Sequence, residues 1–190
     1  MEERVRRIFL SEAGWQCNFA LIAVGDLKQA LQTQDEERIW YSLHAFLVAA
    51  GNISKLLWPG RNKTPRKPKV QGRPQIPKRG EELRAHLSIP KDSPMVARRV
   101  RNHFEHLDER LEAWAAQPQT GLYGTPWVGP PRDLFKDDTV KHFFRNFDKR
   151  TFTLTFCGEV YELRPIIKAV RGLHRKLVKK GLVRVRLWGP

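Results

Sequence analysis

Apolar side chains in the first part of the chain return every three or four positions, from residue 2 to 31 and again from 35 to 57. This period is typical of helices with one buried face. Gly14 weakens the middle of the first segment, whereas Asp35 can cap the second, which stops at WPG, residues 58–60. We therefore expect two long helices that pair antiparallel. The apolar positions of the first are Val5, Ile8, Phe9, Phe19, Ile22, Ala23, Leu27, Ala30 and Leu31.

A third amphipathic helix is predicted from residue 93 to about residue 117. Ser93 can cap it, Pro94 suits the first helical position, and Pro118 follows its end. Its apolar side chains lie three or four residues apart and should face the core. They are Val96, Val100, Phe104, Leu107, Leu111 and Trp114.

The C-terminal part of the chain changes pattern. Residues 117–133 are rich in Gly and Pro and cannot continue a helix. Residues 150–163 alternate apolar and polar side chains around Cys157-Gly158-Glu159, which predicts a β-hairpin. Residues 165–180 predict a basic amphipathic helix, and 182–188 are compatible with a last short strand.

These elements predict a mainly α fold with an antiparallel helical bundle. We expect the bundle to cover residues 1–117, and residues 118–190 to form an extension packed on the same domain, with a loop, the small C-terminal β-hairpin and the basic helix. Residues 59–80 should form a Pro-rich basic linker within the bundle, because four prolines between 61 and 80 favour an extended chain.

The formal net charge of +15 comes from two stretches, residues 61–80 and 164–190, which hold eight and nine Lys or Arg and no Asp or Glu. Such an excess favours polyanionic partners, RNA above all. A charged linker can also be a solvated loop without a partner, so both interpretations stay open for the first stretch. The nucleic-acid-binding candidates are Arg61, Lys63, Arg66, Lys67, Lys69, Arg73, Lys78 and Arg79 in the linker, and Arg171, Arg175, Lys176, Lys179 and Lys180 in the tail.

Several other classes of function lack their sequence signals. Cys17 and Cys157 have no neighbours at metal-ligand spacing, and no metal-protease, paired-carboxylate or Gly-rich phosphate motif is present. We therefore expect no metal and no cofactor. The apolar run in residues 19–25 is too short for a membrane span, so we expect a cytoplasmic protein that does not bind membranes. His44 is interpreted as an ordinary helical residue.

The predicted third helix carries Arg101, Asn102 and His106 away from its apolar side. Asn102 and His106 are four residues apart, so the amide can orient the imidazole. Arg101 and His106 point in different directions on one helix, and a facing second copy would bring two of each together. The alternative is purely structural: Arg101 pairs with Glu105 and His106 is an ordinary surface residue.

The string Arg101-Asn102, three further positions and His106 resembles the motif of the HEPN superfamily, and the likeness covers about residues 2–117. The resemblance implies an all-helical bundle that dimerises so that two motifs share a cleft. It also implies a metal-independent ribonuclease of the kind found in toxin–antitoxin and phage-defence systems. The basic linker, the hairpin and the C-terminal tail depart from the minimal HEPN bundle.

The chemistry of His and Arg fits this activity. A group that titrates near neutral pH can remove the proton of an RNA 2′-hydroxyl, another can protonate the leaving 5′-oxygen, and a cation can stabilise the charge that grows on phosphorus. We expect an RNA endonuclease that leaves 2′,3′-cyclic phosphate ends and acts as a homodimer, with a cognate antitoxin or nucleotidyltransferase as a further partner. The alternative is a non-catalytic nucleic-acid-binding module, or a regulatory, antitoxin-like interaction module.

Overall fold

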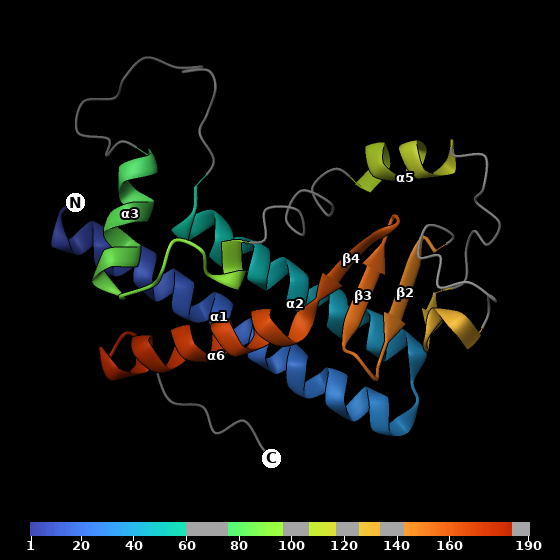
Figure 1. Cartoon of the computed structure of the whole chain (residues 1–190). Helices are drawn as coiled ribbons and strands as arrows, with labels where there is room; N and C mark the ends of the chain where they lie inside the picture. The colour runs from blue at the N-terminus through green and yellow to red at the C-terminus, as the bar shows by residue number, and fades with distance from the viewer. Residues whose placement is uncertain (60–75, 97–106, 117–125, 134–142, 184–190) are drawn as a thin grey trace.

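A computed structural model describes residues 1–59, 76–96, 107–116, 126–133 and 143–183. This part of the chain is mainly helical, with a small four-stranded sheet on its C-terminal side, which confirms the predicted mainly α class. Figure 1 shows the two longest helices side by side, with the last helix lying along the first and the sheet beyond it. None of the helices in the described ranges is long and apolar enough to span a lipid bilayer.

The two predicted long helices are α1 (Glu3–Thr33) and α2 (Glu36–Leu57), and their antiparallel pairing is confirmed. Gln34 ends α1 in the left-handed conformation, with φ 56°. Asp35 caps α2 as predicted, since its carboxylate accepts a hydrogen bond of 3.0 Å from the backbone N–H of Arg38. A two-residue connection thus reverses the chain.

The expected weak point in α1 has another role. The helix runs without interruption through Gly14, and the chain that follows the last helix folds back there. A Cβ added to Gly14 would lie 1.9 Å from Val183 Cγ2, so the glycine makes room for this contact. Leu182 and Val183 form no strand, and the rest of the strand expected at 182–188 lies outside the described residues.

Two of the predicted apolar positions of α1, Ile8 and Phe19, do not face the core, and neither does Trp15. Ile8, Trp15 and Phe19 are exposed by 59%, 51% and 47%, and the rings of Trp15 and Phe19 lie 5.9 Å apart on the surface. The buried side of α1 is instead lined by smaller residues, among them Ala13, Cys17 and Ala20. Small side chains let α2 approach closely along this side.

The predicted linker is wrong at its C-terminal end, because α3 (Ile76–His86) begins inside it. Leu83 and Leu87 are buried and anchor this segment to the core. The approach is close, since a Cβ on Gly80 would lie 2.5 Å from Pro59 Cδ. Composition favoured an extended chain here, but long-range burial of two leucines stabilises a helix. Residues 60–75 lie outside the described part.

The predicted third helix is described only at its two ends. The 3₁₀ turn η1 (Pro94–Val96) follows Ser93, whose hydroxyl accepts from the backbone N–H of Met95 at 3.4 Å. At the other end, α5 (Leu107–Ala115) stops close to the expected residue.

The expected core side of the third helix is partly wrong. Leu107 is 36% exposed, whereas Trp114 is buried and lies 5.4 Å from Phe144, measured between ring centroids. The reason is that α5 packs on the sheet, a partner that the helical pattern alone did not reveal.

The sheet has the strand order β1-β2-β3-β4, formed by β1 (Trp127–Val128), β2 (Arg145–Asp148), β3 (Thr153–Phe156) and β4 (Glu159–Glu162). β1 is parallel to β2, and the other neighbours are antiparallel. β1 and β2 extend the predicted hairpin into a four-stranded sheet.

The predicted hairpin is confirmed. Phe156 pairs with Glu159, so the loop between β3 and β4 consists of Cys157 and Gly158 alone. Both have positive φ, 48° and 74°, as a type I′ turn requires.

The predicted basic helix is α6 (Leu163–Lys179), which packs along α1. It runs antiparallel to α1, since His174 meets Asn18 while Val183 lies over Gly14. Its buried face joins α1, α2 and the sheet in one hydrophobic core, so residues before and after 117 share that core. The buried side chains of α6 are Leu163, Ile166, Ile167, Val170, Leu173, His174 and Leu177.

Candidate nucleic-acid-binding groove

A long groove of about 1440 Å³ runs between the C-terminal half of α1 and α6. This volume exceeds the range of about 300–1,000 Å³ that is usual for small-molecule sites, so the groove suits an extended ligand. We call it the α1–α6 groove. It is lined by Leu21, Val24, Gly25, Lys28, Gln29, Leu31, Gln32, Phe152, Arg164, Ile167, Lys168, Arg171, His174 and Arg175.

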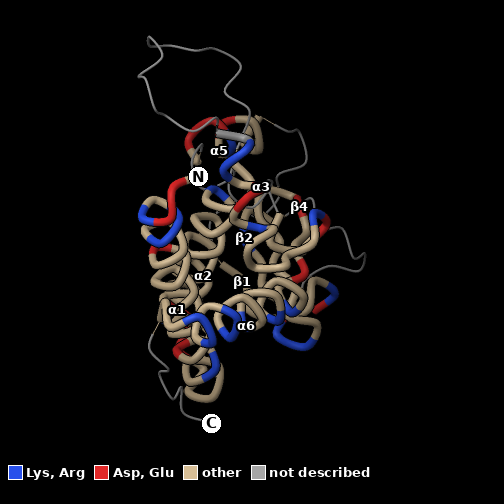
Figure 2. Tube along the Cα trace, turned by 90° about the vertical axis from the view of Figure 1, so that its left-hand side faces the viewer, with Lys and Arg blue, Asp and Glu red and all other residues tan. Residues whose placement is uncertain are grey.

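One wall of the groove is a row of cations on α6. Arg164, Lys168, Arg171 and Arg175 are separated by four, three and four residues, so they lie on one side of the helix. All four side chains are exposed, while the adjoining face of α6 is packed into the core. The row is about 16 Å long, from the rise of 1.5 Å per residue, and the core fixes its direction. Figure 2 shows blue Lys and Arg positions on α6, next to α1.

The other wall belongs to the last turns of α1. Lys28, Gln29 and Gln32 are exposed there and face the groove with one ammonium group and two amides. The floor between the walls is apolar and is formed mainly by Leu21, Val24, Gly25, Leu31 and Ile167. The groove therefore combines a cationic wall, an amide-bearing wall and an apolar floor.

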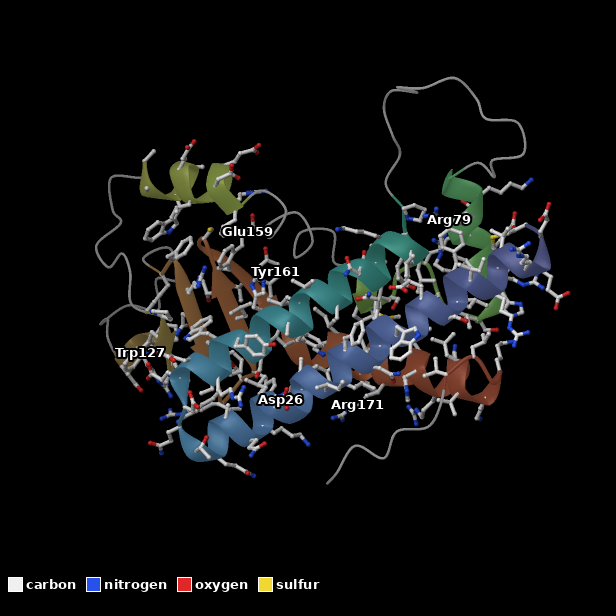
Figure 3. The ribbon with its side chains drawn as sticks, turned by 180° about the vertical axis from the view of Figure 1, so that it is seen from behind. Asp26, Arg79, Trp127, Glu159, Tyr161 and Arg171 are labelled. Atoms are coloured by element: carbon white, nitrogen blue, oxygen red, sulfur yellow. The ribbon has the colours of Figure 1, made fainter. Side chains whose placement is uncertain are left out.

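The electrostatic character of the groove is strongly one-sided. Its lining contains five Lys or Arg and no Asp or Glu. Asp26 follows Gly25 on α1, but it does not line the groove; Figure 3 labels it together with Arg171 on α6. Like charges gathered along a hollow with an apolar floor raise the local concentration of anions. The groove is thus suited to a phosphate-bearing polymer.

A buried polar pair closes the floor at one end. His174 Nε2 lies 3.0 Å from Asn18 Oδ1, and both residues are buried. An amide oxygen only accepts, so the imidazole donates through Nε2. Burial lowers the pKa of His174, which keeps the ring neutral at pH 7. This pair holds α6 against α1 and adds no charge to the groove.

The other end of the groove is formed by Phe152, in the turn between β2 and β3. Its backbone is left-handed, with φ 62°, a conformation that bulky side chains rarely adopt. The ring packs edge-on against Phe147, with centroids 5.3 Å apart. The Arg164 guanidinium lies over the Phe152 ring at 5.7 Å and donates a hydrogen bond of 2.8 Å to the carbonyl of Arg150.

Of the five tail candidates, the structure brings Arg171 and Arg175 into the groove. Lys176 faces the fold instead, since its ammonium donates to the carbonyls of Leu87 and Ser88 at 3.0 and 2.7 Å. Lys179 and Lys180 are exposed but do not line the groove.

The linker candidates are described only in part. Lys78 is exposed on α3, and the guanidinium of Arg79 lies over the ring of Phe9 at 4.5 Å. Neither lines the groove. The remaining linker candidates lie outside the described residues, namely Arg61, Lys63, Arg66, Lys67, Lys69 and Arg73.

The predicted catalytic residues Arg101, Asn102 and His106 also lie outside the described residues, directly before α5. Their assignment stays a prediction from the sequence.

A second polar cluster ties α5 to the sheet. Arg110 lies 3.8 Å from Glu159, which also accepts a hydrogen bond of 3.1 Å from the Tyr161 hydroxyl. Figure 3 shows Glu159 and Tyr161 next to α5. Burial, with the nearby Glu159 carboxylate, raises the pKa of Tyr161. We interpret this cluster of Arg110, Glu159 and Tyr161 as a structural contact.

On α2, partial burial and then the charge of Arg145 lower the pKa of His44.

The two cysteines are poor nucleophiles and metal ligands in this fold. Burial raises the pKa of the Cys17 thiol, and it raises that of Cys157 to about 11. Both therefore stay protonated at neutral pH. Within the described ranges, no group of three or more His, Cys, Asp or Glu could hold a metal ion.

The sequence interpretation missed half of this site. It named Arg171 and Arg175 but neither Arg164 nor Lys168, although the spacing of four, three and four residues was a readable signal. It gave no reason to place Lys28 and Phe152 beside them, because no local pattern reports which distant segments meet. Comparisons with protein-family models, with curated proteins and with solved structures find no match to this chain, so the geometry and chemistry of the groove are what its interpretation rests on.

Proposed function

We propose that this protein binds RNA in the α1–α6 groove and cleaves it as a metal-independent endonuclease of HEPN type. The observation that carries the binding part is the groove lining, with five cations and no carboxylate. The cleavage part rests on the sequence string of Arg101, Asn102 and His106. A cytoplasmic location and a homodimeric active form belong to the same proposal.

The groove favours a polyphosphate chain over a small anion. Its cations are spread along α6 at steps of about 4.5–6 Å, rather than gathered around one point. Each contact between a cation and a phosphate releases condensed counterions, which makes binding sensitive to salt. For a single strand, the slope of log affinity against log salt is about −0.7 for each phosphate neutralised.

The test of binding is a salt titration of fluorescence anisotropy with a labelled RNA of mixed sequence. The double variant Arg171→Gln/Arg175→Gln should bind more weakly and should have a slope smaller by about 1.4, since two contacts are lost. The matched control is Arg132→Gln/Lys91→Gln, which removes two exposed charges that do not line the groove. Equal slopes in the two double variants would remove the groove from the proposal.

The test of cleavage uses the same RNA in the presence of EDTA. Cleavage should persist and leave 2′,3′-cyclic phosphate ends, because the 2′-hydroxyl is the nucleophile and side chains move the protons. His106→Ala and Arg101→Ala should each abolish it, and Asn102→Ala should weaken it. Undiminished cleavage by the His106 variant would refute the assignment.

The homodimer is tested by light scattering together with a dilution series of the cleavage assay. A composite site predicts specific activity that falls when the protein is diluted below its dissociation constant. A monomer with full activity would contradict a shared site.

A second candidate function is RNA binding without cleavage. The groove favours it, because its lining offers cations that suit phosphates and amides that suit base edges, and these are sufficient for binding. Salt-dependent binding with intact RNA in every condition would establish this alternative.

A further inference from the structure

The two walls of the α1–α6 groove differ in chemistry. The α6 wall has four cations in a row, whereas the α1 wall has Gln29 and Gln32 beside the single charge of Lys28. A double helix presents phosphates on both of its edges and hides the faces of its bases. A single strand presents phosphates on one side and bases on the other. The asymmetry of the groove matches the single strand.

The floor of the groove also fits a single strand better than a double helix. Leu21, Val24 and Ile167 line the bottom of the groove but are almost fully buried, so the apolar surface open to a ligand there belongs mainly to the neighbouring Gly25 and Leu31. Unstacked bases bury their faces well against such surface, while their edges can exchange hydrogen bonds with amide groups. A charged phosphate is not stabilised by contact with apolar side chains.

The end of the groove at Phe152 offers a place for one base. The turn holds this phenylalanine in a left-handed backbone conformation, with φ 62°, although a glycine or asparagine would fit there with less strain. The ring lines the groove and is only half-buried, and the Arg164 guanidinium lies over it. Aromatic rings and guanidinium planes are the surfaces on which proteins stack single-stranded bases.

We infer that the groove takes single-stranded RNA, with its phosphates along the α6 cations and one base stacked at the Phe152–Arg164 end. This inference rests on the proposed RNA binding and specifies its form. It makes Phe152 a residue that contacts a base, in addition to its packing against Phe147.

The experiment compares four ligands of equal phosphate number: a single-stranded RNA, the same RNA carrying one abasic position at each site in turn, an RNA duplex of half the length, and inorganic polyphosphate, which has no bases. Each is titrated against wild type, Phe152→Leu and Phe152→Trp. Leucine retains apolar packing against Phe147, and tryptophan retains an aromatic face. A third variant, Lys168→Gln, serves as the reference for loss of a phosphate contact.

We expect wild type to prefer the single strand over the duplex at least tenfold and to lose affinity at one abasic position. Phe152→Leu should bind the single strand roughly five- to hundred-fold more weakly, the loss caused by removing one stacked base. It should bind polyphosphate as wild type does, and tryptophan should restore RNA binding. Lys168→Gln should weaken RNA and polyphosphate alike.

The possible failures are distinguishable. Equal binding of single strand and duplex, or a Phe152→Leu variant that weakens polyphosphate as much as RNA, would overturn the inference while leaving RNA binding intact. Absence of binding to every ligand at low salt would instead refute the proposed function.

Discussion

Gly25 allows the groove to be tested without harming the fold. It lies within α1, it is exposed in the floor of the groove, and a Cβ built on it meets no atom within 4 Å. A glycine inside a helix costs about 1 kcal/mol relative to alanine. Replacing it with a longer helix-forming residue should therefore raise the free energy of unfolding while changing the chemistry of the groove.

The informative pair is Gly25→Glu and Gly25→Gln, which share size and shape and differ in charge. Both should be more stable than wild type by about 0.5–1 kcal/mol, from helix propensity. A carboxylate about 6 Å from a bound phosphate repels it by about 0.7 kcal/mol at the dielectric constant of water and by about 3 kcal/mol at a value of 20. Gly25→Glu should thus bind RNA about three- to hundred-fold more weakly than Gly25→Gln.

Two measurements decide the outcome: urea unfolding followed by circular dichroism, and RNA anisotropy at two salt concentrations. The difference between the two variants should shrink at higher salt, because mobile ions screen the added charge. Equal RNA affinity of the two variants would show that phosphates do not pass over the floor of the groove. A loss of stability in both would show that the space beside Gly25 is already in use.

Three further changes test contacts that pack the fold, at Gly14, Gly80 and His174. Gly14→Ala should destabilise the wild-type protein, because the added Cβ displaces the Val183 side chain, but it should stabilise the Val183→Ala variant. If the two substitutions change the free energy of unfolding additively, the contact between these residues is contradicted. Gly80→Ala should cost about 1–3 kcal/mol despite its better helix propensity, because the added Cβ meets a proline ring and a backbone carbonyl that cannot give way; unchanged urea unfolding would refute that packing. His174 has a lowered pKa in the folded state, so its contribution to stability is present above the unfolded-state pKa and is lost as the pH falls below it. His174→Gln, which retains a donor to Asn18, should therefore lose less stability than wild type between pH 7.5 and 5, and parallel pH profiles would contradict this.

The elements that the sequence predicted well are those set by local pattern. Helices α1, α2 and α6 each bury one continuous face, and local residues determine where they begin and end, as Asp35 does for α2. The β3–β4 hairpin was predictable for the same reason, since Cys157-Gly158 supplies the positive φ angles of its turn.

The elements that the sequence did not predict depend on distant partners. β1 has only two residues, and β2 buries the adjacent Asn146 and Phe147, so neither shows the alternation of a half-buried strand. Asn146 instead donates to the carbonyls of Trp127 and Gly129, at 3.3 and 2.8 Å, and so ties β1 to β2. Side-chain hydrogen bonds of this kind between distant residues leave no periodic signal in the sequence.

The groove shows why charge alone was a limited guide to the site. The sequence located excess charge in residues 61–80 and 164–190, but what distinguishes a binding surface from a solvated one is whether the cations are held in a fixed row. On α6 the row is fixed, because Ile167, Val170 and His174 anchor the helix against α1 and the sheet. Cations on a rigid support lose little conformational freedom when phosphates bind. Lys176 shows the opposite use of the same chemistry, because its ammonium donates to the carbonyls of Leu87 and Ser88 and does not line the groove. The position of each cation around the axis of α6, rather than their number, therefore determines which of them can meet a ligand.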